Sequence, residues 1–276
     1  MNDTWQPDFI SQLPLFELLT DAYNGAWQAK MEWPTIADYN QHAAEYAKKI
    51  NNCNGSPIRF IRQVTKSQEF IYSYEPSVYL RGEVLTRLNN WHDFFNMLVW
   101  LTFPKIKAAF NHWQYHHIKQ RTVIQKTRTP VENILTHLDE NGVIVVSSDE
   151  TLLELLRGQH WQELFWQRRE CVKTKMQFLI TGHALYEKGL KPYLGMTGSG
   201  LLFKVSDRFF KQSLSQKINE VDCLVSENLM QHKAVAAHTK LVPVPILGIP
   251  AWWPANAALD FYKNTQYFRA KKDLSK

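Results

Sequence analysis

Hydrophobic residues recur at helical spacing along much of the chain and alternate in only a few short stretches. Apolar residues three and four positions apart indicate an amphipathic helix, whereas strict alternation indicates a strand. The predicted helices are 9–27, 36–50, a segment that begins at Asn90 and ends at Phe103, 104–126, 131–138, a leucine-rich helix that ends at Gly158, a tryptophan-rich helix from Trp161, 183–188 and 211–232. The predicted strands are 58–64, 70–74, 143–147, 176–181 and 201–205. Long helices with a few short strands predict a mostly helical α+β fold.

Local signals fix several helix ends. Asn90 precedes Asp93 by three residues, which is a variant of the capping box. Pro104 is suited to the first position of a helix. Thr129 and Glu132 form a further capping pair, and Gly142 is placed to end the helix that follows them.

Charge is unevenly distributed, and this bears on how the chain is organised. Residues 1–45 carry seven acidic residues and one Lys, for a net charge of −6, whereas residues 46–131 carry thirteen basic and four acidic residues, for a net charge of +9. We find no Gly/Ser-rich linker and no repeat, so we predict a single domain over residues 1–276. Within it, residues 1–52 form an acidic helical part that can pack against the basic part, and residues 268–276 form a flexible tail.

Cysteine usage and the chain's apolar runs predict a cytoplasmic protein. The three cysteines are an odd number and form no Cys-x-x-Cys pair, which favours reduced thiols. The first residues lack the basic start and apolar run of a signal peptide. Residues 94–104 are too few to span a bilayer. Residues 241–259 are interrupted by four prolines. We therefore expect no membrane span.

Several longer motifs carry a family resemblance. Asn-Asn-Trp-His-Asp-Phe-Phe-Asn at 89–96 and Leu-Val-Trp-Leu-Thr-Phe-Pro-Lys at 98–105 resemble the hallmark of a bacterial family known as domain of unknown function 3025. The segments at 135–142, 182–188 and 243–250 fit the same pattern. The resemblance extends over most of the chain, and it implies a family without implying a mechanism.

Two pairs of residues in these motifs are candidate metal ligands. His183 and Glu187 are four residues apart, so on a helix their side chains share one face. An imidazole and a carboxylate so placed suit one metal ion, or a general base and its orienting acid. A hydrogen-bonded pair that stabilises a helix explains the spacing equally well. His92 and Asp93 are the second pair, with Asn96 four residues after His92 as a binding candidate. Asp93 also fits a helix-start acid, and His92 also fits a buried core histidine.

Asp139 and Glu140 are candidate catalytic carboxylates. If they end a helix, they lie at the end that disfavours negative charge, at a cost of about 0.3–1 kcal/mol each when exposed. A nearby cation or a bound ligand would compensate. If the segment is instead a hairpin, Asn141 and Gly142 form its turn and the two acids only decorate the tip.

Together these residues suggest one polar site. A metal-dependent hydrolase needs two or three fixed ligands, an open position for water and a carboxylate to accept its proton. We therefore hypothesise a divalent-metal site in a hydrolase that acts on a small-molecule substrate of unknown identity. Its residues are His92, Asp93, His183 and Glu187 as metal ligands, with Asp139 and Glu140 as catalytic groups. The hypothesis requires His92, His183 and Glu187 to meet in a cleft.

The alternative is a non-catalytic module that binds nucleic acid or another protein. Helix 104–128 is basic and carries interleaved aromatic residues, a combination that tracks phosphates and stacks bases. Its candidate binding residues are Lys105, Lys107, Lys119 and Arg121. A solvated cationic face paired with the acidic first 45 residues explains the same charges. A third interpretation is a small-molecule pocket that the rigid segment 243–254 covers. The same segment can equally pack over the hydrophobic core without covering a pocket.

Overall fold

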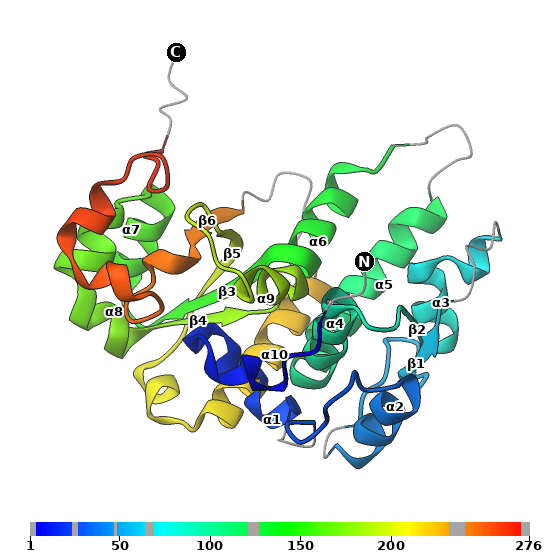
Figure 1. Cartoon of the computed structure of the whole chain (residues 1–276). Coiled ribbons are helices and arrows are strands. Elements are labelled where there is room, and N and C mark those ends of the chain that lie inside the picture. Colours follow the sequence, from blue (N-terminus) through cyan, green and yellow to red (C-terminus); the bar gives the residue numbers. More distant parts are fainter. Residues whose placement is uncertain are drawn as a thin grey trace.

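The computed structural model describes residues 4–23, 27–46, 49–63, 69–120, 127–231 and 241–271 (Figure 1). The α-helices in this part are α1 (Thr20–Tyr23), α2 (Ile36–Glu45), α3 (Tyr74–Arg81), α4 (Trp91–Thr102), α5 (Pro104–Gln120), α6 (Pro130–Asn141), α7 (Glu150–Gly158), α8 (Arg169–Lys175), α9 (His183–Gly189) and α10 (Leu214–Met230). The strands are β1 (Arg59–Arg62), β2 (Glu83–Thr86), β3 (Gly142–Ser147), β4 (Met176–Ile180), β5 (Thr197–Lys204) and β6 (Val242–Pro245). The prediction of a mostly helical α+β fold is confirmed.

The strands form two small sheets. β1 and β2 pair in parallel, and the larger sheet has the order β4-β3-β5-β6. β3 is parallel to β5 and antiparallel to β4, and every residue of β3 is buried. In Figure 1 this larger sheet lies beside α9 and α6, while β1 and β2 lie on the other side of α4 and α5.

An aromatic cluster ties the N-terminal part to α4. Trp91, Phe94 and Phe95 lie on α4 and are buried. Their rings contact those of Trp5, Phe9, Phe16, Tyr23, Trp27, Trp33, Tyr39 and Tyr186. Large rings that pack edge to face contribute to stability beyond the apolar area they bury. The N-terminal part is therefore held on α4 largely by apolar contacts, and α4 is buried on nearly all sides.

Some local predictions are wrong. The helix predicted at 9–27 begins as two 3-10 helices, Pro7–Ser11 and Pro14–Leu19, because Pro14 supplies no N–H to continue a helix. The strand predicted at 70–74 is a 3-10 helix, Phe70–Tyr72, followed by α3, and its three apolar side chains are exposed rather than buried on one face.

The C-terminal part of the chain packs against the core over much of its described length. Of the tail predicted at 268–276, Phe268 is buried and packs on Tyr262, and residues 272–276 lie outside the described part. The segment 243–254 contributes an edge strand and buried residues to the core. Among the helices that the structure describes, none combines the length and the apolar character needed to cross a membrane.

Candidate metal site

The register of the larger sheet brings α6 and α9 together. Val143 pairs with Ile180, so the residues just before β3 lie beside those just after β4. The N–H of Gly182 donates to the carbonyl of Gly142 at 2.9 Å. A Cβ atom on Gly182 would lie 2.3 Å from the Gly142 nitrogen, which is closer than atoms can approach. Glycine at 182 therefore permits the contact that places His183, at the start of α9, beside the end of α6.

Local hydrogen bonds fix the start of α4, which carries His92. The Asn90 side chain accepts the N–H of Asp93 at 3.1 Å, as the capping prediction requires. The Asp93 carboxylate binds Arg87 through three hydrogen bonds. It accepts them from Nη2 at 2.8 Å, from Nε at 3.0 Å and from the backbone N–H at 2.6 Å. Asp93 therefore joins α4 to the segment after β2.

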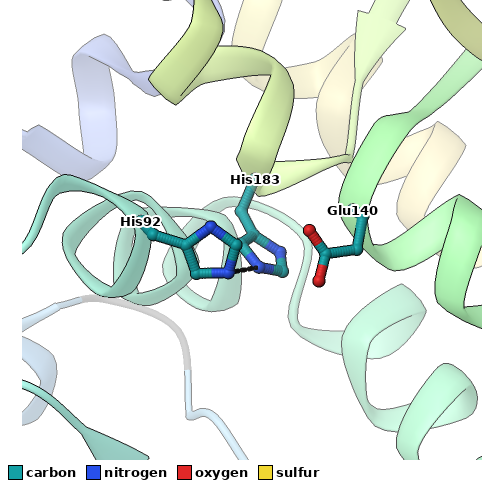
Figure 2. A group of neighbouring side chains, drawn as sticks. All are labelled: His92, Glu140 and His183. Carbon is teal, nitrogen blue, oxygen red and sulfur yellow. Dashed lines mark hydrogen bonds between the residues drawn. The ribbon is translucent and has the colours of Figure 1, made fainter.

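Three side chains from three helices converge in front of α4 (Figure 2). His92 from α4, Glu140 from α6 and His183 from α9 each offer one ligand atom, and these atoms lie within 4.8 Å of one another. The closest approach joins the Nε2 atoms of the two histidines at 2.9 Å. A pair of imidazoles and a carboxylate is a common ligand set for zinc and for non-haem iron.

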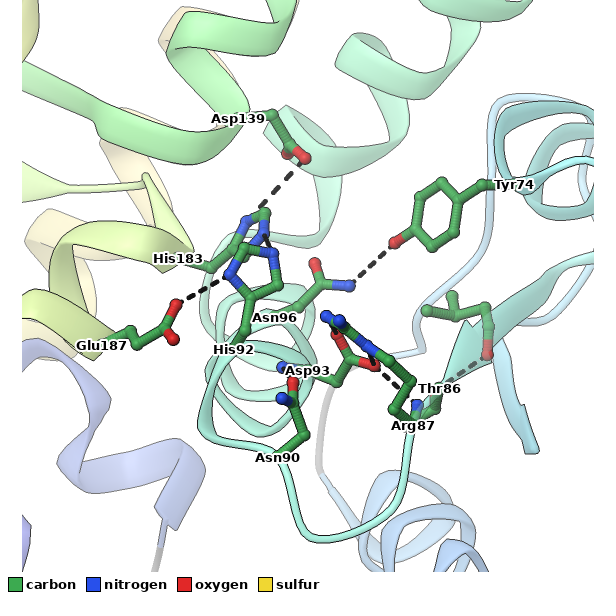
Figure 3. A network of polar contacts seen from close by, with 11 residues as sticks. Tyr74, Thr86, Arg87, Asn90, His92, Asp93, Asn96, Asp139, His183 and Glu187 are labelled. Atoms are coloured by element: carbon green, nitrogen blue, oxygen red, sulfur yellow. Dashed lines mark hydrogen bonds and ion pairs between the residues drawn. The ribbon is translucent and has the colours of Figure 1, made fainter. Parts of the chain in front are cut away.

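A carboxylate stands behind each histidine ring (Figure 3). Glu187 Oε2 lies 2.9 Å from His92 Nδ1, and Asp139 Oδ2 lies 3.8 Å from His183 Nδ1. The first distance is a hydrogen bond, in which Nδ1–H donates because an ionised carboxylate only accepts. The second is too long for a hydrogen bond, yet the charge favours a proton on Nδ1. The two Nε2 atoms face each other and are hydrogen-bonded at 2.9 Å, so one proton, or a metal ion in its place, can lie between them.

The two histidines differ in protonation. Burial lowers the pKa of His183 to about 3, although the charge of Asp139 acts to raise it. Burial also acts to lower the pKa of His92, but the hydrogen bond with Glu187 and the charge of Glu140 outweigh it and raise this pKa above its usual value. His183 is therefore neutral at pH 7, and His92 is the first of the two to take up a proton.

Lys107 and Asp139 form a buried ion pair. The exposed fraction is 3% for the Lys107 side chain and 14% for that of Asp139. Burial acts to raise the pKa of Asp139, but the Lys107 ammonium holds it below its usual range. Lys107 is the cation that compensates Asp139 at the unfavourable end of α6. Its prediction as a surface residue that contacts phosphate is wrong, because its ammonium points into the protein.

A polar cavity of about 390 Å³ opens beside these groups. Its lining consists of Gln63, Tyr74, Glu75, Leu85, Arg87, His92, Asp93, Asn96, Gln114, Ile118, Arg128, Glu132, Thr136, Asp139, Glu140 and His183. A volume of this order accommodates a small molecule. Asn96, a predicted binding residue, lines the wall and donates from Nδ2 to the Tyr74 hydroxyl at 2.8 Å (Figure 3).

The sequence-derived site residues thus have different surroundings. His92 and His183 meet as the hypothesis required, and Glu140 joins them. Glu187 was expected to bind the same metal ion as His183. Its carboxylate instead forms a hydrogen bond with His92, and it is not part of the cavity lining. Both oxygens of Asp93 bind Arg87, which leaves them badly placed for a metal ion.

The remaining predicted residues belong to the basic helix. Lys105 and Lys119 are exposed on α5, where Lys105 Nζ lies 3.0 Å from Cys223 Sγ and Lys119 Nζ lies 5.8 Å from the centroid of the Tyr115 ring. Arg121 lies outside the described residues.

The cavity is also lined by Glu75, Tyr74 and Arg87, which were not predicted from the sequence as site residues. Arg87 lies only six residues before Asp93, so their separation was a usable local signal. Glu75 and Tyr74 stand on α3, which was predicted in part as a strand, and no motif in the sequence marks them.

The fold and the site define a class of protein: a mostly helical α+β protein with a His–His–Glu cluster on the wall of a polar cavity. Within that class, the chain matches the family described as protein of unknown function (DUF3025) over residues 58–272, and it belongs to that family. The matched range includes every residue of the cluster. No curated protein and no solved structure shows significant similarity to the chain.

Proposed function

We propose that this protein is a metal-dependent hydrolase whose divalent ion is held by His92, His183 and Glu140. The observation that carries the proposal is the convergence of their three ligand atoms within 4.8 Å on the wall of a cavity. Three protein ligands leave a position for water, which is the arrangement of catalytic rather than structural zinc sites.

The distances support a shared ion. Two imidazole nitrogens that bind one zinc ion at about 2.0–2.1 Å stand roughly 3–3.4 Å apart. The Nε2 atoms of His92 and His183 are 2.9 Å apart, close to that separation. Histidine ligands commonly donate their other ring N–H to a carboxylate, which orients the ring and strengthens the ligand. Glu187 takes this role for His92, and Asp139 faces the same atom of His183.

The chemistry follows from the bound ion and the cavity. A divalent ion lowers the pKa of a water ligand, so that hydroxide becomes available near neutral pH. The cavity holds a small polar substrate next to that position, with Arg87, Arg128, Asn96 and Gln114 among the groups that can contact it. We propose a cytoplasmic location for the protein on the basis of its cysteine usage.

Metal binding can be measured without knowing the substrate. The full chain is stripped with a chelator, loaded with Zn²⁺, desalted and analysed by mass spectrometry of its metal content. We expect about one zinc ion per chain, and its loss in His92→Ala, His183→Ala and Glu140→Gln. Glu187→Gln should retain zinc with an affinity about 10–100-fold weaker, because Glu187 supports a ligand without being one.

His137→Ala is the matched control, since His137 is an exposed histidine on α6. Its zinc content should equal that of the wild type. Wild-type protein that retains no zinc, or ligand variants that retain as much as the wild type, would refute the metal site. Retention of iron in preference to zinc by the same three residues would argue for oxygen chemistry and against a hydrolase.

Hydrolysis is then tested with the zinc-loaded protein on a panel of small esters, amides and phosphoesters. A reaction that His183→Ala abolishes and His137→Ala leaves unchanged supports the proposal. The nucleic-acid alternative is weakened by Lys107, which is buried, whereas Lys105 and Lys119, the other predicted binding residues of this helix that the structure describes, are exposed.

A further inference from the structure

Glu75 faces the same cavity as the metal cluster but comes from a separate element. It lies in the first turn of α3, whereas the three candidate ligands lie on α4, α6 and α9. The neighbouring Tyr74 also reaches the cavity, where its hydroxyl accepts a hydrogen bond from Asn96 (Figure 3). α3 therefore forms one wall of the cavity and contributes a carboxyl group to its lining.

The other carboxylates that line the cavity are already engaged. Asp93 binds the Arg87 guanidinium, and Asp139 pairs with Lys107. Glu132 accepts the backbone N–H of Thr129 in the capping box of α6. Glu140 is a candidate metal ligand. These commitments leave none of the four well placed to receive a proton from a water molecule bound to the ion.

Glu75 has a different environment. Its Oε2 accepts a hydrogen bond from the neutral amide of Asn111 at 2.6 Å, and the same amide nitrogen binds its backbone carbonyl at 3.0 Å. Asn111 is buried, with 4% of its surface exposed, and its hydrogen bond fixes the position of the carboxyl group on α3. Glu75 is thus held in place by a neutral donor and keeps its capacity to exchange a proton.

The charges around Glu75 favour exchange near neutral pH. Burial and the charge of Asp139 on α6 raise its pKa to about 7, while the Asn111 hydrogen bond, Lys107 on α5 and Arg128 act to lower it. A group whose pKa lies near the working pH is the most effective general acid or base.

We propose that Glu75 is the proton-accepting group of this site, which takes the proton of the metal-activated water directly or through one intervening water molecule. The inference rests on the proposed metal site. In the step it describes, the water O–H bond breaks, its proton passes to a Glu75 carboxylate oxygen and the resulting hydroxide stays on the ion. The same carboxyl group can return the proton to the leaving group of the substrate.

Cobalt(II) reports on this step without a substrate. Cobalt replaces zinc in many such sites, and its visible spectrum changes when its water ligand ionises. The full chain is loaded with Co²⁺ alone, and its absorption is titrated from pH 5 to pH 10. Because Glu75 and the bound water interact, the wild type should titrate in two coupled steps. Glu75→Gln should titrate in one step, displaced by roughly one pH unit toward lower pH, because a neighbouring negative charge has been removed.

Two further variants separate proton transfer from structure. Glu75→Asp keeps an ionisable group and should retain two steps, whereas Glu154→Gln, an exposed carboxylate on α7, should match the wild type. Cobalt content is measured for every variant. If all variants bind cobalt equally and Glu75→Gln titrates like the wild type, the role of Glu75 is refuted and the metal site stands. If the wild type binds no cobalt, the proposed function fails and the role of Glu75 fails with it.

Discussion

The buried ion pair between Lys107 and Asp139 gives a strong prediction about stability. Lys107→Met keeps most of the aliphatic stem and removes the ammonium group, whose nitrogen also lies 5.6 Å from the centroid of the Trp100 ring. The exposed fraction of the Asp139 side chain is 14%, so its carboxylate would lose its cation while remaining poorly solvated. Removal of one partner from a buried ion pair costs about 3–5 kcal/mol of unfolding free energy. We expect Lys107→Met to fall in that range.

Urea unfolding at pH 7, followed by tryptophan fluorescence and circular dichroism, measures this loss. The double variant Lys107→Met/Asp139→Asn should recover a large part of it, because the uncompensated charge is gone. Lys173→Met is the control, since Lys173 pairs with Glu170 on the surface of α8, where the exposed fractions are 42% and 78%. An exposed pair contributes about 0–1 kcal/mol. The reasoning is refuted if Lys107→Met costs no more than this control, or if the double variant is as unstable as the single one.

Two other substitutions test how the site is built. Gly182→Ala should lower the unfolding free energy by about 1–3 kcal/mol and weaken zinc binding, because the new methyl group meets the backbone of Gly142. Thermal unfolding measures the first effect and metal content measures the second. A variant with unchanged stability and zinc content would contradict the close contact. Glu75→Gln tests the pKa of Glu75 through stability. The pKa of Glu75 rises from 4.5 to about 7 on folding, so its stabilising contribution is complete below pH 4.5 and is lost as the pH rises through 7. The unfolding free energy of the wild type relative to Glu75→Gln should therefore fall by up to about 3 kcal/mol between pH 4 and pH 8, and parallel urea titrations that show a constant difference would exclude the shift.

Features of the fold that depend on neighbouring residues could be predicted from the sequence. The start of α4 follows from Asn90, and that of α6 from the capping box of Thr129 and Glu132. Pro104 likewise begins α5. The signals in these segments act over three or four residues, so packing elsewhere does not change them. Near the N-terminus, the prediction of one helix over 9–27 overlooked a local signal, because Pro14 begins a new 3-10 helix. The strand at 70–74 was predicted from its residue types, although its side chains are exposed in a 3-10 helix.

The candidate site was predictable in its residue types and less so in its contacts. His92 and His183 were expected to meet and do so, at 2.9 Å. Glu187 was expected to bind the same metal ion as His183, which lies four residues earlier. It forms a hydrogen bond with His92 on another helix instead. Helical spacing places two side chains on one face, but it does not say which element will pack there. The contact between α4 and α9 decides that question, and it joins residues about ninety positions apart.

Asp139 and Glu140 show most clearly where prediction from sequence stops. Adjacent residues on a helix point about 100° apart. At the end of α6 this angle directs Asp139 toward Lys107 on α5, while Glu140 approaches the two histidines. One carboxylate is thereby neutralised by an ion pair and lies 3.8 Å from His183 Nδ1, and the other is available to a metal ion. The sequence assigned both the same catalytic role because nothing local distinguishes them. Their difference arises from the packing of α5, which also buries Lys107 and, through the hydrogen bond from Asn111, fixes Glu75 on the cavity wall.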